Sequence, residues 1–167
     1  MSEQAIGVDS GDPISPESVI EFLEFRLDGH RYALEVGRVG QVIWKPATTR
    51  VPNAPNGIYG SASIEGDVVV AIDTYEVVGI DRPFSDPEGG YLIVLDRGDT
   101  PQPVGLLVES VDGIERHHIE TVSPPSEGVA PLDDDWFRAK IVSETGPDVP
   151  VFDSHQLLAA IHPATTR

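Results

Sequence analysis

Apolar and polar residues alternate in short runs along most of the chain, a pattern typical of half-buried β-strands. The first clear case lies in residues 20–36, where two such runs flank the sequence Asp28-Gly29-His30. Asp-Gly readily adopts the left-handed backbone of a tight turn, so this segment predicts a β-hairpin. After it, Val36, Val39 and Val42 recur at a spacing of three, which predicts a short turn leading into the next strand.

The same order of features occurs twice in the chain. An offset of 72 relates the second strand of the hairpin, and the strand after it, to a later segment; it pairs Val104 with Tyr32, Leu106 with Leu34, Val108 with Val36, Val111 with Val39 and Ile114 with Val42. Further along, an offset of 80 pairs Val69 with Val149 and Asp73 with Asp153. Apolar runs in any β protein look alike, so chance is the alternative explanation. The repeated order of features favours an internal duplication.

Short strands separated by Gly, Pro and Asp predict a mainly β fold built from two half-sized barrels of about five strands each. Asp73 and Asp153 each follow an apolar strand, where an aspartate can cap a helix. Residues 154–161 then predict a short C-terminal helix that ends before Pro163. Residues 1–19 have no hydrophobic period and predict a flexible arm. We therefore expect one domain over 20–162 and a tail over 163–167.

The net charge of the chain limits the classes of partner that it is expected to bind. Its 28 acidic and 11 basic residues give a net charge of −17, and the basic residues are scattered, so we expect neither nucleic acid nor an anionic membrane surface as a partner. No apolar run is long enough to span a membrane, and the first residues lack a basic segment followed by an apolar run, so we expect no signal peptide. The absence of cysteine fits a reducing compartment, and cytoplasmic localisation is the expectation. The acidity itself fits either a surface adapted to concentrated salt or a dedicated acidic binding face.

No catalytic motif for phosphate binding, zinc-dependent hydrolysis or a serine nucleophile is present, so we expect no enzyme activity, no catalytic residue and no cofactor. His117-His118 are neighbours in an extended segment and point to opposite sides, which disfavours a shared metal ion. Asp133-Asp134-Asp135 lacks the glycine and further ligands of a calcium loop and is interpreted as a solvated loop. No metal site is therefore predicted.

Aromatic and proline-rich segments are the remaining candidates for binding. Two proline-rich loops, at 51–57 and 123–128, are either ordinary connections between strands or a stiff rim that binds a protein. Trp136 is interpreted as a core residue. For Trp44, core packing and a role as an interface anchor both remain open.

The order of these segments resembles that of the CheW-like domain family over roughly residues 22–161. The matching pieces are Phe25-Arg26-Leu27, Tyr32-Ala33-Leu34, the series Val36-x-x-Val39-x-x-Val42, Val51-Pro52-Asn53-Ala54-Pro55, Gly60, Gly66 with 68–73, and 104–111. The resemblance implies two intertwined five-stranded β-barrels (SH3-like subdomains) and no catalysis. It also implies binding to the cytoplasmic tip of chemoreceptors and to the regulatory domain of a CheA-type histidine kinase. The acidic composition suggests a member of haloarchaeal type.

The resemblance also implies where a receptor helix would bind, in a groove between the barrels. On this chain the groove would include Val36, Val39, Val42 and Ile43, which are apolar as a helix-binding groove requires. Core packing is the alternative role of each of these side chains.

Two positions depart from the pattern of the family. Where the family commonly has an acidic residue and the arginine of an Asn-Leu-Arg-Gly segment that pairs with it, this chain has Gln41 and Glu65. The joint loss of both partners leaves no stranded charge but removes the usual ion pair. The alternative to a standard coupling protein is therefore a diverged CheW-like module with other partners, or a competitor for positions in the receptor array. The candidate binding residues are Val36, Val39, Gln41, Val42, Ile43 and Glu65.

Overall fold

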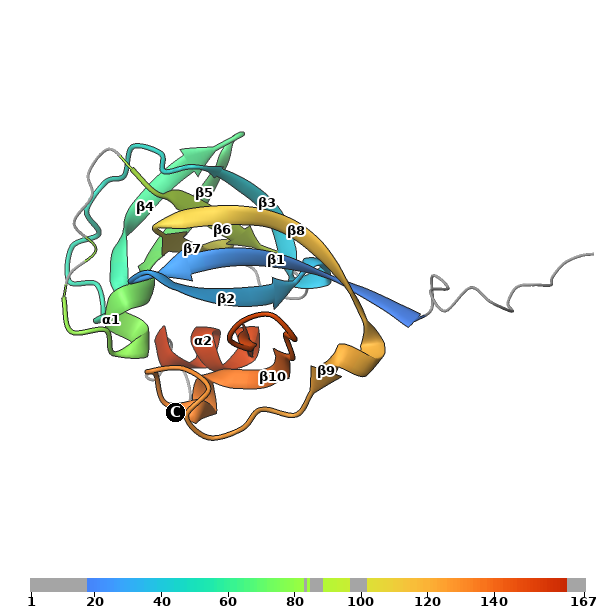
Figure 1. Ribbon diagram of the computed structural model, residues 1–167. Helices are drawn as coiled ribbons and strands as arrows, with labels where there is room; N and C mark the ends of the chain where they lie inside the picture. The colour runs from blue at the N-terminus through green and yellow to red at the C-terminus, as the bar shows by residue number, and fades with distance from the viewer. Residues whose placement is uncertain (1–17, 83, 85–88, 97–101, 162–167) are drawn as a thin grey trace, which may run out of the picture.

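A computed structural model describes residues 18–82, 84, 89–96 and 102–161 (Figure 1). The predicted arm over 1–19, apart from its last two residues, and the tail over 163–167 lie outside the described residues. Within them the fold is mainly β, as predicted. Its strands are β1 Val19–Leu27, β2 His30–Glu35, β3 Val39–Trp44, β4 Ile58–Ile64, β5 Asp67–Asp73, β6 Tyr91–Leu95, β7 Val104–Val108, β8 Ser110–His118, β9 Val122–Ser123, β10 Phe137–Ile141 and β11 Val149–Phe152.

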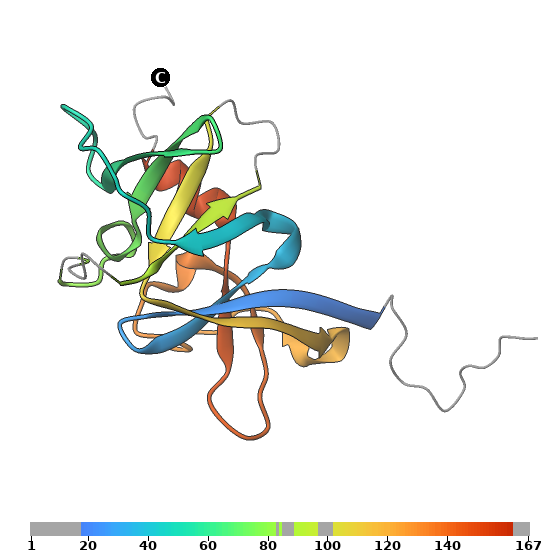
Figure 2. The same ribbon diagram turned by 90° about the horizontal axis from the view of Figure 1, so that it is seen from above.

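The strands form two sheets that exchange hairpins between the two sequence repeats. One sheet has the order β8-β1-β2-β11-β10-β9 and the other β3-β6-β7-β5-β4. The first hairpin, β1–β2, thus lies among strands of the second repeat, while β6–β7 lies among strands of the first. In Figure 2 the two subdomains lie one above the other, and β1, drawn in blue, runs between them. The two intertwined subdomains are confirmed, and the two-residue strand β9 adds a sixth strand to one of them.

Each sheet is closed by the segment that follows its edge strand. After β3, Thr49 pairs with Ser61 of β4, and the two N–H···O bonds measure 2.7 and 2.8 Å. After β8, the N–H of Val142 donates to the carbonyl of Thr121 at 2.7 Å, next to the pairing of β9 with β10. Thr49 and Thr121 are 72 residues apart. The duplication read from the sequence therefore extends to the way in which both barrels close.

Tight turns fix the register of two hairpins. Asp28 and Gly29 connect β1 to β2 with φ angles of 53° and 81°, and Glu65 and Gly66 connect β4 to β5 with φ angles of 52° and 89°. Two successive residues with positive φ are the signature of a type I′ turn, whose twist matches that of the flanking strands. The predicted first hairpin is thus confirmed with its turn. Glu65 is placed at the tip of the second hairpin.

β1 is buried on both faces and links the two cores. Leu23, Phe25 and Leu27 join the large core, to which both sheets contribute side chains such as Leu92 and Leu106. On the opposite face of β1, Phe22 joins a smaller cluster with Ala33, Ile141, Val149 and Val151. Alternate residues of one strand therefore fill two cores.

One short α-helix follows the last strand of each repeat: α1 over Thr74–Val78 follows β5, and α2 over Ser154–Ile161 follows β11. The carboxylate of Asp73 accepts from the N–H of Glu76 at 3.2 Å, and that of Asp153 accepts from the N–H of His155 at 2.9 Å. Both predicted helix caps and the C-terminal helix are confirmed. The described residues also include three single-turn 3-10 helices: η3 Val36–Arg38, η4 Ile119–Thr121 and η5 Asp134–Trp136. The first of them is the expected turn before β3.

Candidate functional site

Most of the predicted groove residues lie on or beside the edge strand β3. Val36 begins the 3-10 turn η3, while Val39, Val42 and Ile43 lie on β3 and pack, partly buried, against the large core. β3 is hydrogen-bonded to β6 alone and forms one end of the five-stranded sheet. The three side chains of β3 therefore combine core packing with a position at the margin of a sheet. Both roles left open by the sequence remain compatible with this placement.

The structure brings Gln41 and Glu65 together. Both line a cavity of about 260 Å³ at the end of the five-stranded barrel. Buried Val69 and Leu95 also line it, and Asp67 and Asp96 add two carboxylates. The two positions are 24 residues apart in the sequence and line the same cavity. Their chemistry differs from the expected ion pair, because a neutral amide now faces an acidic wall.

The six-stranded barrel has an equivalent cavity of about 670 Å³, lined by Glu24, Val149 and Thr145 among others. These three residues correspond through the repeat offsets to Asp96, Val69 and Glu65. Glu24 is 4% exposed, and one of its carboxylate oxygens lies 3.0 Å from the Nε2 atom of His117. His117 is therefore a hydrogen-bonding partner of a buried carboxylate, a role that the sequence did not predict.

The other polar clusters noted in the sequence have local structural roles. The Nδ1 atom of His118 accepts from the N–H of Glu120 at 3.1 Å, so the two neighbouring histidines have different partners. Asp133 caps η5 by accepting from the N–H of Asp135 at 2.9 Å. In the part of the chain that the structure describes, no group of three His, Cys, Asp or Glu side chains could hold a metal ion.

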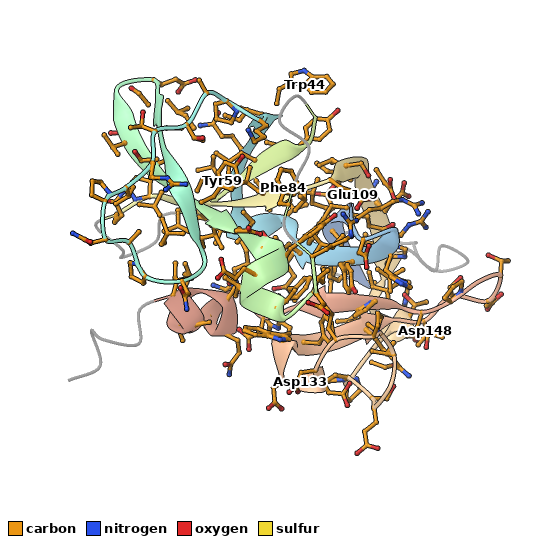
Figure 3. The ribbon with its side chains drawn as sticks, turned by 90° about the vertical axis from the view of Figure 1, so that its left-hand side faces the viewer. Trp44, Tyr59, Phe84, Glu109, Asp133 and Asp148 are labelled. Atoms are coloured by element: carbon orange, nitrogen blue, oxygen red, sulfur yellow. The ribbon has the colours of Figure 1, made fainter. Side chains whose placement is uncertain are left out.

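A hydrogen-bond network around Tyr75 joins the two barrels. Tyr75 lies on α1, and its hydroxyl donates to Glu109 at 2.7 Å. The same oxygen accepts from the N–H of Asp28, in the β1–β2 turn of the other sheet, at 3.2 Å. Glu109 itself lies where the chain passes from β7 to β8 (Figure 3). Burial, and then the hydrogen bond to Glu109, raise the pKa of Tyr75 to about 12.

The two tryptophans differ in exposure. Trp136 packs against the large core, as predicted. Trp44 is 72% exposed at the end of β3 and stacks on Tyr91 with ring centroids 4.6 Å apart. Beside it, the Lys45 ammonium lies 5.1 Å from the ring centroid of Tyr59 (Figure 3). An exposed tryptophan on a rigid aromatic neighbour has the character of an interface anchor.

Two interlocked, mostly β subdomains, each with a cavity at one end, make up the described fold. The chain belongs to the CheW-like domain family, whose model matches residues 21–162. It is similar to "Chemotaxis protein CheW" of Klebsiella aerogenes, with 29% identity over 107 residues, covering 64% of this chain and 63% of that protein. It is also similar to "Protein PilI" of Pseudomonas aeruginosa, with 26% identity over 123 residues, covering 71% of this chain and 67% of that protein.

A solved structure shares the fold. The scaffolding protein TtCheW from Thermoanaerobacter tengcongensis superimposes with a TM-score of 0.71 at 20% identity, covering 83% of this chain and 91% of that chain. At this identity the likeness concerns the fold. Among the described residues, no helix is both long enough and apolar enough to cross a membrane.

Proposed function

We propose that this protein is a cytoplasmic chemotaxis adaptor that couples chemoreceptors to a CheA-type histidine kinase by protein–protein binding, without catalytic turnover. The observation that carries the proposal is the family match over residues 21–162, which covers nearly the whole described fold. Such an adaptor works by supplying contacts at two faces, so that a change of conformation in the receptor alters the kinase through differential binding.

The receptor-binding surface that we propose is centred on Val39 and Val42 of β3. The internal repeat supplies counterparts on the other edge strand, β8, where Val111 and Ile114 occupy the equivalent positions. Ile114 is 57% exposed and so presents a large aliphatic side chain to a partner. An amphipathic receptor helix would cover apolar side chains of this kind.

A second candidate function is a diverged CheW-like module with other partners, or a competitor for positions in the array. The observation that favours it is the cavity lined by Gln41 and Glu65, where an acidic wall replaces the expected ion pair. The similarity to PilI as well as to CheW is compatible with a related chemosensory system.

Copurification at high salt with the receptor tip and the kinase of the same cell distinguishes these functions. The adaptor should retain both partners, and retention of neither would exclude the standard coupling role. Val39→Asp and Ile114→Asp should each abolish retention of the receptor, because a charge on an apolar docking surface must be desolvated without a partner. The Ile114→Asp variant tests binding apart from folding, because the exposed side chain of Ile114 contributes little to the core.

Val68→Asp is the matched control, since Val68 is an equally exposed aliphatic residue, 58% exposed, on β5. It should leave retention of the receptor unchanged. Circular dichroism checks that all three variants are folded. Undiminished receptor binding by folded Val39→Asp and Ile114→Asp would refute the proposed surface while leaving the family assignment intact.

A further inference from the structure

Basic side chains gather at one cavity of this acidic protein. The cavity, of about 280 Å³, lies between the β1–β2 hairpin and the segments 129–131 and 147–150. Arg26, His30 and Arg31 line it from the hairpin side. The chain has only 11 lysines and arginines and a net charge of −17, so two arginines in one small cavity are a local reversal of its charge. We call this cavity the arginine pocket.

The two arginines lie directly opposite each other across the hairpin. Arg26 of β1 and Arg31 of β2 are register partners, an arrangement in which like charges repel. One carboxylate, that of Asp112 on β8, holds both: the Arg26 Nε lies 3.3 Å from Oδ1 and the Arg31 Nε lies 3.0 Å from Oδ2. At close range, the Asp112 carboxylate is therefore shared by two guanidinium groups.

The terminal nitrogens of the pair are largely uncommitted. Both close contacts to Asp112 use Nε, whereas a guanidinium carries four further N–H donors on its two terminal nitrogens. Among the described residues, the next contact of these groups, from Arg31 Nη1 to Glu24 Oε1, is long at 3.9 Å, and Glu24 already contacts His117 at 3.0 Å. The side chains of Arg26 and Arg31 are 36% and 46% exposed. The geometry leaves donors available to an incoming oxyanion.

The remaining walls of the arginine pocket are mostly apolar. Val129, Pro131 and Pro150 line it, and their carbon atoms suit a short aliphatic stem. Asp148 is the acidic member of the lining. Its carboxylate is held by Lys140 at 3.4 Å and by the N–H of Ser143 at 3.1 Å, so its charge is already compensated. A ligand matched to these walls combines a carboxylate head with an aliphatic stem.

We propose that the arginine pocket binds a glutamate or aspartate side chain of a protein partner, held by Arg26 and Arg31 together. Bidentate arginine–carboxylate pairs are the strongest polar contacts that such a site can offer, and the proline-rich rim is stiff, which limits the entropy lost on docking. The pocket is distinct from the β3 surface. It gives the adaptor a basic contact site within a surface that otherwise repels acidic partners.

The test is a titration of the full chain, at one fixed KCl concentration, followed by the NMR signals of the backbone amides and arginine Nε–H groups. The probes are glutarate, its neutral analogue glutaramide, and inorganic phosphate. We expect glutarate to shift the signals of Gly29, His30 and both arginine Nε–H groups in a saturable manner. Glutaramide, which has the same stem without charge, should produce no saturable shift.

Variants separate the pocket from the general charge of the surface. Arg26→Gln and Arg31→Gln should each weaken glutarate binding about tenfold, the size expected for one charge-assisted hydrogen-bonding group. Arg138→Gln is the matched control, because Arg138 is also an exposed strand arginine paired with one carboxylate, Glu35, at 3.0 Å. It should bind glutarate as the native chain does.

The outcomes are distinct from one another. Equal loss of binding in Arg138→Gln, or equal binding in all variants, would reduce the effect to nonspecific charge and overturn the proposal. Binding of phosphate without binding of glutarate would assign the pocket to a small inorganic anion and would also overturn it. None of these results depends on the receptor or kinase, so failure here leaves the adaptor function standing.

Discussion

At the scale of single residues, the hydroxyl of Tyr75 connects segments of both barrels. Tyr75 is 2% exposed and packs with its ring edge-on to Phe84, so its apolar part is an ordinary core contact. Its hydroxyl, however, meets groups from three other segments: Asp28, Arg82 and Glu109. The partners lie 47, 7 and 34 residues away along the chain. No local pattern announces such a meeting point.

Removal of this hydroxyl should weaken the junction of the barrels. Tyr75→Phe leaves the Glu109 carboxylate without its 2.7 Å donor and the N–H of Asp28 without its acceptor. We expect a loss of about 1–3 kcal/mol in the free energy of unfolding, measured by urea denaturation. Tyr59→Phe, which removes a hydroxyl from a partly buried ring outside this network, is the control and should cost less. Equal stability of Tyr75→Phe and the native chain would show that the network contributes nothing.

Burial also predicts how stability responds to alkali. The pKa values of Tyr32 and Tyr75 are raised from 10.0 to about 12, in both cases mainly by burial. A group whose pKa is higher in the folded state stabilises the fold below its unfolded value, and this contribution is lost as the pH rises through the folded value. Stability should therefore fall between about pH 10 and pH 12.

Tyrosinate absorbance and circular dichroism, recorded together, follow this alkaline transition. Ionisation of the two buried tyrosines should coincide with loss of structure, and Tyr75→Phe should remove one of the late-titrating groups. If both tyrosines ionised near pH 10 with the fold intact, the assigned burial would be wrong.

At the scale of elements, the sequence predicted the strands better than their partners. Period-two alternation located the first hairpin, and the 72-residue offset related its second strand and the strand after it to β7 and β8. The exchange of hairpins could not be predicted from alternation. It depends on the parallel pairing of β5 with β7, for example of Val70 with Val104, although β6 lies between these two strands in the sequence. Partner choice depends on nonlocal packing, whereas alternation reports only that one face of a strand is buried.

For the candidate site residues, too, local sequence patterns did not identify nonlocal partners. Only a family resemblance linked Gln41 to Glu65, since nothing local relates a strand residue to a turn 24 residues later. The Arg26–Arg31 pair was missed although its signal was present. A two-residue turn at Asp28-Gly29 pairs Leu27 with His30, and therefore Arg26 with Arg31. Extending the predicted turn by one register step would have found the arginine pair.

Closure of the five-stranded barrel depends on a glycine. A Cβ atom at Gly60 would lie 2.8 Å from the carbonyl oxygen of Thr49, the residue that closes this barrel against Ser61. The obstacle is backbone, which cannot rotate away as a side chain can. We expect Gly60→Ala to lower the free energy of unfolding by about 1–3 kcal/mol, as overpacking commonly does.

Urea denaturation of Gly60→Ala beside Gly37→Ala provides the comparison. A Cβ atom at Gly37 meets nothing within 4 Å, so this control should be neutral or slightly stabilised. An alanine at position 60 that was as stable as the control would mean that the Thr49 segment can move without cost, and that the closure contributes little.

At the scale of the whole molecule, the net charge of −17 opposes the compact state, because carboxylates crowded onto one surface repel each other. The described ion pairs relieve this only locally, for example Arg82 with Asp28 at 2.9 Å and Arg138 with Glu35 at 3.0 Å. Acidic residues far outnumber basic ones, so most carboxylates have no basic side chain to pair with. Mobile cations must supply the remaining compensation.

Stability should therefore rise with salt. Screening lengths shrink from about 10 Å at 0.1 M to about 3 Å at 1 M, so most of the repulsion between surface carboxylates should be removed within that range. We expect the melting temperature to rise by about 5 °C or more between low and molar KCl, which corresponds to roughly 1–2 kcal/mol for a chain of this size. Sucrose at matched osmolality is the control, because it favours compact states without screening charge. A gain that sucrose reproduces would assign the effect to solvent exclusion, whereas a gain specific to KCl would identify the acidic surface as an adaptation to concentrated salt.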